Sequence, residues 1–142
     1  MDGYCLEDLS EGMTARLRKT VTEADIGLFA GVTGDFNPLH VDAEYAGETP
    51  FGGRIAHGML TAGLVSAVLG TRLPGPGSIY VSQSMRFRAP VYPGDTVTAE
   101  VEVLSIERDR GFVTLETRAR VGTRAVLSGE AVLKTPSRSD MQ

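Results

Sequence analysis

The stretch Ile55-Ala-His-Gly-Met-Leu-Thr-Ala-Gly-Leu-Val-Ser-Ala-Val-Leu-Gly-Thr71 decides the fold of this chain. Its apolar residues occupy nearly every side of a helix rather than one stripe, which predicts a buried helix over 55–71. Leu73-Pro-Gly-Pro-Gly77 ends this helix, because proline cannot continue it and glycine favours a turn. The helix is too short for a membrane span, and it is interrupted by His57, Thr61 and Ser66.

The residues after this helix alternate between apolar and polar, which predicts β-strands. We expect the first of them, 79–87, to place Ile79, Val81, Met85 and Phe87 on one face. Three more strands are expected over 97–103, 113–121 and 125–134, separated by turns at 92–95, 109–111 and 122–123.

The first third of the chain predicts one more strand and short helices. Residues 14–21 alternate as a strand, and Thr22 can cap a helix over 23–33 that Gly34 ends. Asp42 can cap one or two helical turns over 42–46. Residues 1–13 read as a lead-in and 135–142 as a disordered tail. The expected fold class is therefore α+β: an antiparallel sheet of about five strands around one long buried helix, in a single domain over 1–142 with its core at about 12–134.

Composition narrows the class of protein. A chain of 142 residues is long enough for one core without disulfides or metals, and its net charge of −4 argues against a nucleic-acid partner. Arginines gather over 108–124, but acidic residues lie among them, which is typical of the solvated face of a sheet. One cysteine, Cys5, and the lack of a signal-peptide pattern favour the cytoplasm, and no membrane partner is expected.

The chemistry of the chain is concentrated in Phe29-Ala-Gly-Val-Thr-Gly-Asp-Phe-Asn-Pro-Leu-His-Val-Asp42. The pair Asn37-Pro38 predicts an irregular loop and excludes a regular helix there. A neutral imidazole at His40 can accept a proton, and a carboxyl group at Asp35 can accept or donate one. If the two side chains converge, they can hold one water and add its elements to a polarised double bond, or remove them. The Asn37 amide can fix the loop or orient that water.

A second chemical element, His57-Gly58, opens the long helix. The first turn of a helix has unpaired N–H groups at its positive end, and glycine lets a substrate carbonyl approach closely. The Gly58 N–H can therefore stabilise a developing enolate oxygen.

Each of these residues also has a structural interpretation. Asp35 can simply close a turn, and His40 and His57 can be core histidines, with His57 as structural support. The sequence has no paired-histidine spacing typical of zinc sites, so we expect no metal. Ser66 has no base at a telling spacing and no nucleophile-elbow context, so a serine nucleophile is not expected.

Two segments together carry a resemblance: 29–42, with its Asp-x-Asn-Pro-Leu-His, and Phe51 to Leu60, with its His-Gly-Met. They closely resemble the hydratase motif of the MaoC-like family, in particular its (R)-specific enoyl-CoA hydratases that feed polyhydroxyalkanoate synthesis. The likeness continues through 73–80 and 93–101 and covers most of 12–134. It implies a hot-dog fold, a homodimer with an acyl-CoA tunnel at its interface, and no cofactor, since coenzyme A is part of the substrate.

The resemblance also implies catalytic roles. Asp35 and His40 match the pair that holds the water, with His40 as the base and Asp35 as the proton donor to C2. Water then adds syn to a trans-2-enoyl-CoA and gives an (R)-3-hydroxyacyl-CoA. Asn37 matches the supporting amide and Gly58 the backbone donor to the thioester oxygen.

The resemblance extends to the substrate pocket. Ser66 and Leu69 are expected on the helix face that lines the acyl pocket, and His57 is expected to contact the substrate region. Arg54 stands where relatives often have another residue, and it can face either the coenzyme A phosphates or solvent.

Three other functions share these features. One is a dehydratase that runs the reverse reaction on an acyl-carrier protein. A second is an acyl-CoA thioesterase on the same fold, because fold alone does not fix function. A third is a non-catalytic acyl-CoA-binding protein, which would have no need for the acid, the base and the glycine.

Overall fold

The computed structural model describes residues 2–141 as an α+β fold. Four α-helices, five strands and two short 3-10 helices follow one another in the order η1 (Leu6–Asp8), β1 (Thr14–Thr20), α1 (Glu23–Thr33), α2 (Pro38–Val41), α3 (Ala43–Gly47), α4 (Gly58–Thr71), β2 (Ile79–Phe87), β3 (Thr96–Glu107), β4 (Phe112–Val121), β5 (Arg124–Lys134) and η2 (Arg138–Met141). The predicted helix over 23–33 and the predicted strands are confirmed to within a few residues.

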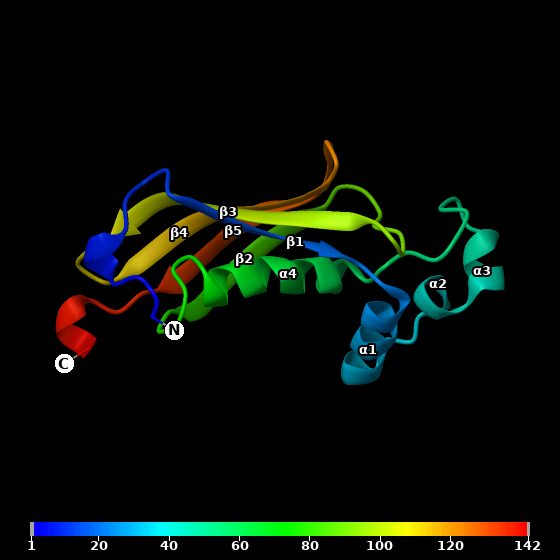
Figure 1. Cartoon of the computed structure of the whole chain (residues 1–142), viewed down its shortest axis with the longest axis horizontal. Coiled ribbons are helices and arrows are strands. Elements are labelled where there is room, and N and C mark those ends of the chain that lie inside the picture. The colour runs from blue at the N-terminus through cyan, green and yellow to red at the C-terminus, as the bar shows by residue number, and fades with distance from the viewer. Residues whose placement is uncertain (1, 142) are drawn as a thin grey trace.

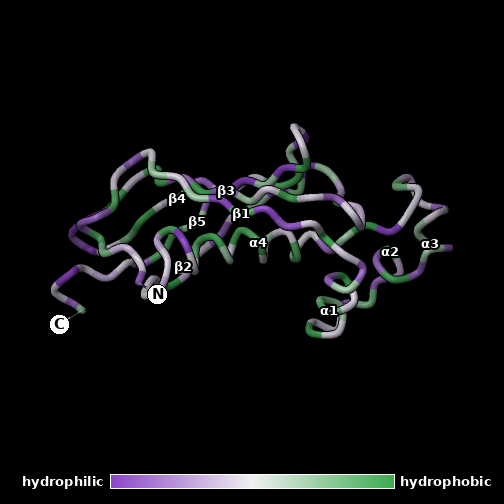
Figure 2. Tube along the Cα trace, in the orientation of Figure 1, coloured by the Kyte–Doolittle hydropathy of each residue, from purple (hydrophilic) through white to green (hydrophobic). Residues whose placement is uncertain are grey.

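The strands form one antiparallel sheet in the order β1-β3-β4-β5-β2. Helix α4 runs along one face of this sheet and packs mainly on β3 (Figure 1). Hydrophobic residues recur along α4 and along the strands (Figure 2). The arrangement confirms the expected sheet around one long helix. Helices α1 to α3 lie beyond the end of the sheet where α4 begins (Figure 1).

The core lies between α4 and the inner face of the sheet. The predicted alternation is confirmed on β3 and β4, whose inner residues are buried: Val97, Ala99, Val101, Val103, Val113, Leu115, Thr117 and Ala119. From α4, Val65, Val68 and Leu69 pack into the same cluster. This core also includes Leu6 and Leu9, so the N-terminal segment is part of the packed structure and not only a lead-in.

Strand β2 differs from the sequence prediction in which residues share a face. A β-bulge at Val81 shifts its pairing with β5, so that Tyr80 lies opposite Leu133 and Met85 opposite Gly129. An extra residue in one strand reverses the side-chain alternation that follows it. Tyr80 therefore shares the inner face with Met85 and Phe87, whereas Ile79 lies on the other face.

Two predicted boundaries also differ. The long helix begins at Gly58 rather than Ile55, because His57 is extended and the Ala56 N–H donates to the Val91 carbonyl at 2.7 Å. The tail is not disordered over 138–141: it forms η2, where Arg138 forms an ion pair with Asp8 at 2.7 Å. Gln142 lies outside the described residues. No helix within 2–141 is both long and apolar enough to span a membrane.

Candidate active site

The loop that carries the predicted catalytic residues follows directly from the way α1 begins and ends. At its start, the Thr22 hydroxyl accepts from the Asp25 N–H at 3.1 Å and the Asp25 carboxylate accepts from the Thr22 N–H at 2.9 Å, a capping box. At its end, Gly34 adopts the left-handed conformation (φ 79°) and its N–H donates to Ala30. This turn directs the chain away from the helix and places Asp35 at its exit.

Asn37 and Pro38 start a helix here rather than exclude one, which corrects the sequence prediction. The Asn37 side-chain oxygen accepts from the Leu39 N–H at 3.0 Å, so Asn37 is the N-cap of α2. Pro38 occupies the first helical position, where its missing N–H has no consequence and its fixed φ suits the helix. Of the two roles expected for Asn37, the structure assigns its oxygen to fixing the loop.

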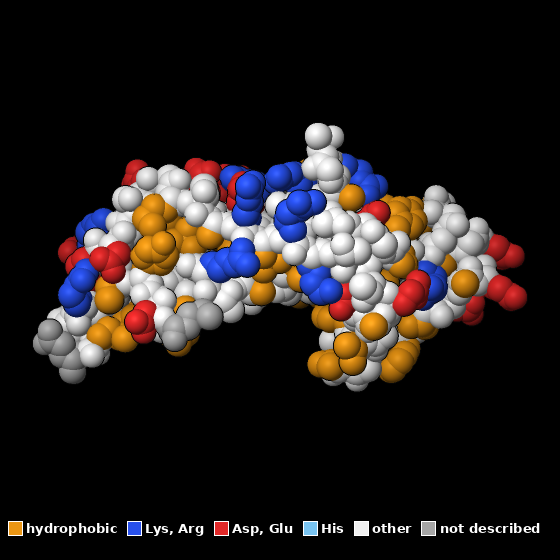
Figure 3. Space-filling model, viewed as in Figure 1, with side chains coloured by type: hydrophobic (Ala, Val, Ile, Leu, Met, Phe, Trp, Pro, Cys, Tyr) orange, Lys and Arg blue, Asp and Glu red, His pale blue; other side chains and the backbone are white. Residues whose placement is uncertain are grey.

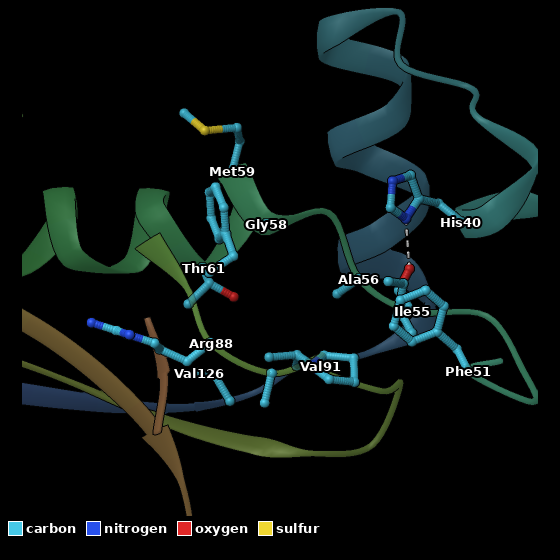
Figure 4. Close-up of a pocket in the computed structure, with 13 residues that line it drawn as sticks. His40, Phe51, Ile55, Ala56, Gly58, Met59, Thr61, Arg88, Val91 and Val126 are labelled. Carbon is cyan, nitrogen blue, oxygen red and sulfur yellow. Dashed lines mark hydrogen bonds between the residues drawn. The ribbon is translucent and has the colours of Figure 1, made fainter. Parts of the chain in front are cut away.

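Helix α2 places His40 in a buried position with one ring nitrogen committed. His40 Nδ1 lies 2.7 Å from the carbonyl oxygen of Ile55. A carbonyl can only accept, so Nδ1 carries the hydrogen and Nε2 is left as the acceptor. Figure 4 shows this bond and the second ring nitrogen on the opposite side of the ring. His40 is thus held in the tautomer that a general base requires.

His57 is buried behind His40 and acts on it by stacking. The two rings lie 3.9 Å apart between centroids with an interplanar angle of 28°, and Phe29 covers His57 at 4.7 Å. His57 Nε2 donates to the backbone carbonyl of Asp35 at 2.9 Å. Its Nδ1 is buried and has no hydrogen-bond partner among the described residues. His57 thus supports both His40 and Asp35, which agrees with its structural interpretation, and its contact with a substrate stays a prediction.

The structure brings Asp35 and His40 together, which their spacing in the sequence left open. One side-chain ligand atom from each of Asp35, His40 and His57 lies within 4.8 Å of the other two. Two hydrogen bonds of about 2.8 Å that meet at one water span about 4.5 Å. The exposed Asp35 carboxylate and the buried His40 ring are therefore close enough to hold one water between them.

The same three residues are a poor cage for a metal ion. A shared zinc ion needs both imidazole lone pairs to point at it from about 2.0–2.1 Å. The lone pairs of two stacked rings lie in nearly parallel planes and do not converge. Each ring also has one nitrogen against a backbone carbonyl. The residues do not fit a metal centre.

Gly58 opens α4 with its N-terminal end free of any side-chain cap. A Cβ at this position would lie 2.7 Å from the ring of Phe87, so glycine lets that ring lie against the first turn of the helix. The Gly58 backbone stands at the positive end of α4, as the sequence predicts. The Phe87 side chain, which is 53% exposed, occupies the space beside Gly58 that a substrate carbonyl would need.

His40 and Gly58 border a cavity of about 420 Å³, whereas Asp35, Asn37 and His57 are not part of its lining (Figure 4). His40, Phe51, Gly58 and Thr61 line it together with Ile55, Ala56, Met59, Phe87, Arg88, Ala89, Pro90, Val91 and Val126. Sequence reasoning missed Thr61, Arg88 and Val126. No sequence pattern indicates that Val126 faces the cavity, because its inward direction depends on a β-bulge between β4 and β5.

The predicted acyl-pocket residues lie in two different places. Ser66 lines a second hollow between α4 and β2, which shares Met59 with the first cavity and also includes Tyr80. Burial raises the pKa of the Tyr80 phenol there. Leu69 is 1% exposed in the core and lines neither hollow.

Arg54 is committed to the protein rather than to solvent. Its guanidinium binds both carboxylate oxygens of Glu23, at 2.7 and 2.8 Å, and donates to the His40 carbonyl at 3.4 Å. Arg54 thus ties the start of α1 to α2 and helps to fix the loop between them.

Comparison with known proteins agrees with this geometry. The MaoC like domain matches residues 7–125. The (R)-specific enoyl-CoA hydratase of Rhodospirillum rubrum is 55% identical over 135 residues, which cover 95% of this chain and 94% of that protein. The 3-hydroxybutyryl-CoA dehydratase of Methylorubrum extorquens is 50% identical and the match covers 94% of this chain and 85% of that protein.

A solved structure supports the same likeness in three dimensions. The (R)-hydratase from Aeromonas caviae involved in PHA biosynthesis superimposes with a TM-score of 0.88 and 47% identity, covering 92% of this chain and 99% of that one. The observed sheet and helix are thus those of the hot-dog hydratases.

Proposed function

The chain belongs to the MaoC-like family, and from this premise we propose that it is an (R)-specific enoyl-CoA hydratase. The observation that supports this most directly is the convergence of Asp35 and His40 within 4.8 Å, with His40 Nε2 free to accept a proton. Fold alone would be compatible with other chemistry; this pair supplies the acid and the base that hydration needs.

The proposed reaction begins with a water held between Asp35 and His40. His40 Nε2 takes a proton from this water as its oxygen bonds to C3 of the trans-2-enoyl-CoA. The electron pair of the double bond moves onto the thioester oxygen, and C2 then takes a proton from the Asp35 carboxyl. The His40 proton finally passes to Asp35, which restores both groups. Because both groups lie on one side of the substrate, water adds syn. We propose the (R) configuration of the 3-hydroxyacyl-CoA product from the likeness to the (R)-specific hydratases.

The negative charge on the thioester oxygen needs a donor, and we assign this role to the Gly58 N–H. The first turn of α4 offers unpaired N–H groups and the positive end of the helix dipole. Phe87 lies over this turn and has to move aside for the substrate. Since Phe87 is half exposed and sits at the end of edge strand β2, its ring has room to do so.

The substrate we propose is an acyl-CoA. Arg88 is the cationic side chain of the first cavity, and its Nε donates to Ser128 at 2.8 Å, which leaves other donors for a phosphate. We place the acyl chain toward the second hollow, along Ser66 and Met59. The free Cys5 and a coenzyme A substrate suit the cytoplasm.

We also propose a homodimer. Strand β2 is an edge of the sheet, and it exposes Ile79, Val81 and Phe87 by 64, 53 and 53%. Apolar side chains on an open edge favour pairing with another chain. The second hollow lies along this strand, so a second copy of the chain seated there would close the acyl tunnel.

The first experiment follows the absorbance of the conjugated thioester with crotonyl-CoA, coupled to an (R)-specific dehydrogenase. We expect the band to disappear and the (R) product to form. Asp35→Asn should abolish this, whereas Asp109→Asn, the same change in the β3–β4 turn, should leave kcat unchanged.

Other outcomes separate the alternatives. Release of free thiol without loss of the double bond would support a thioesterase. Loss of the band only with a carrier-protein thioester would support a dehydratase of that class. Tight binding of crotonyl-CoA without turnover would support a binding protein. An active Asp35→Asn variant would overturn the mechanism.

A further inference from the structure

Thr61 has a buried hydroxyl group that no part of the described chain uses. The residue is 2% exposed, and its Oγ1 has no hydrogen-bond partner within residues 2–141. It lines the first cavity, and Figure 4 shows its oxygen directed away from α4 into the lined space. Buried polar groups are nearly always paired, so this exception needs a reason.

Other helical threonines in this protein donate their hydroxyl to the backbone carbonyl four residues earlier. Thr71, at the end of α4, donates its hydroxyl to the Ala67 carbonyl four residues earlier at 2.6 Å. Thr33 in α1 donates to Phe29 in the same way at 2.8 Å. Threonine in a helix commonly makes this bond. Thr61 does not make it to His57, so its hydroxyl stays free on the cavity side.

Thr61 lies close to Gly58, the residue assigned to bind the thioester oxygen. Residues three apart lie on one face of a helix, and helical side chains lean toward the N-terminus. Thr61 thus shares a face with Gly58 and leans toward it. Ala56, Val91 and Val126 line the same cavity with apolar side chains, and Arg88 adds a cationic one.

We propose that Thr61 is a further catalytic residue, whose hydroxyl donates to the thioester oxygen beside the Gly58 N–H. This inference rests on the proposed hydratase function. As water adds to C3, negative charge grows on the thioester oxygen and the hydrogen bond from Thr61 Oγ1 strengthens. The charge returns to C2 when C2 takes its proton, and Thr61 keeps its own proton throughout. The unpaired hydroxyl of the free enzyme is thus reserved for the reaction.

The test compares Thr61→Val, which keeps the shape and removes the hydroxyl, with Thr61→Ser, which keeps the hydroxyl. For crotonyl-CoA we expect Thr61→Val to lower kcat by about 10- to 100-fold with KM changed less than about twofold, because the lost bond matters most in the transition state. Thr61→Ser should restore most of kcat. The Tm of Thr61→Val should equal or exceed that of the wild type, because an unpaired buried hydroxyl is replaced by a methyl group.

Three results would overturn the role. Wild-type kcat in Thr61→Val would exclude it, and so would a higher KM with unchanged kcat, which indicates ground-state binding. A lower Tm in Thr61→Val together with an equally impaired Thr61→Ser would show that Thr61 acts through packing alone.

A second measurement does not depend on turnover. Crotonyl-CoA bound to Asp35→Asn should absorb at longer wavelength than free crotonyl-CoA, because hydrogen bonds to the thioester oxygen polarise the conjugated system. Adding Thr61→Val should reduce this shift. If the wild type fails to hydrate enoyl-CoA but the shift depends on Thr61, the proposed function is wrong and the contact is correct. If the shift is the same with and without the hydroxyl, the contact is wrong.

Discussion

The site loop and the outer face of the sheet are both rich in polar side chains, but these side chains have different kinds of hydrogen-bonding partner in the two regions. On the outer face, charges satisfy one another: Arg118 Nε donates to Glu100 at 2.7 Å, and its guanidinium also lies 3.2 Å from Glu116. In the site, side chains are held by backbone carbonyls, as His40 is by Ile55 and His57 by Asp35. Figure 3 shows Lys and Arg side chains gathered over the sheet with Asp and Glu among them.

This difference separates a stabilising arrangement from a reactive one. A side chain that binds a backbone carbonyl with one atom has its other atom left for a substrate, whereas a closed ion-pair cluster has little left to offer. His40 Nε2 is such a remaining atom. Thr61 Oγ1 is also left for a substrate, because it has no hydrogen-bond partner among the described residues. Substitutions in the site should therefore reduce activity more than stability, and substitutions on the outer face should do the reverse.

The largest expected effect is that of His40→Gln. Loss of a general base typically lowers the rate by about 10²–10⁴-fold, so we expect kcat on crotonyl-CoA to fall by that factor. The glutamine amide can still donate to the Ile55 carbonyl, which keeps the Tm within a few degrees. Kinetics and thermal melting on one preparation measure both quantities. A large loss of Tm with the loss of kcat would mean that the site also carries stability, contrary to the comparison.

His57→Phe should have a smaller effect. Phenylalanine keeps an aromatic ring between Phe29 and His40 and loses only the bond to the Asp35 carbonyl. We expect kcat to fall by about tenfold, roughly the value of one hydrogen bond that holds the acid in place. Stability should change little, because the variant also removes the unpaired Nδ1. A loss as large as that of His40→Gln would instead make His57 a catalytic group.

Sequence patterns predicted most of this fold, because period-two alternation and a helix that is apolar on all sides are local signals. Asp35, His40 and Gly58 could be singled out from residue types and from a specific motif. The convergence of Asp35 with His40 depends on Gly34 and on the Asn37 cap, whose geometry no spacing reveals. Val126 and Tyr80 were missed or misplaced for a similar reason, since each depends on a β-bulge.

Thr61 shows a further limit. It stands within the helix pattern as one polar residue among apolar ones, and helical threonines usually bond their own backbone. Only the folded structure shows that this bond is absent and that the hydroxyl faces a cavity.

On the outer face, Glu100→Gln should lower stability by about 0.5–1 kcal/mol and leave kcat unchanged. Burial lowers the pKa of Arg118, but hydrogen bonds and charge from Glu100 and Glu116 outweigh it and raise that pKa overall, so the neutral amide removes a favourable partner. The wild-type and variant Tm values should approach each other in high salt, because screening weakens the pair. A drop in kcat would show that the two regions are coupled, which would break the comparison.

The smallest effect concerns Asp25, a charge in the site half of the molecule that serves stability alone. Two hydrogen bonds lower the pKa of Asp25 in the folded protein, the larger effect coming from the Lys19 ammonium and the smaller from the Thr22 N–H. A carboxylate with a lowered pKa contributes stability above its unfolded pKa of about 3.9, and this contribution is lost as the pH falls through the folded pKa.

Asp25→Asn should therefore lower the Tm by a few degrees at pH 7, and this difference should shrink as the pH falls below about 4. Its kcat should match that of the wild type at pH 7, because Asp25 fixes the start of α1 and leaves the turn at Gly34 unchanged. A difference in Tm that persists at low pH would mean that the side chain stabilises α1 through the neutral hydrogen bonds of the capping box rather than through its charge.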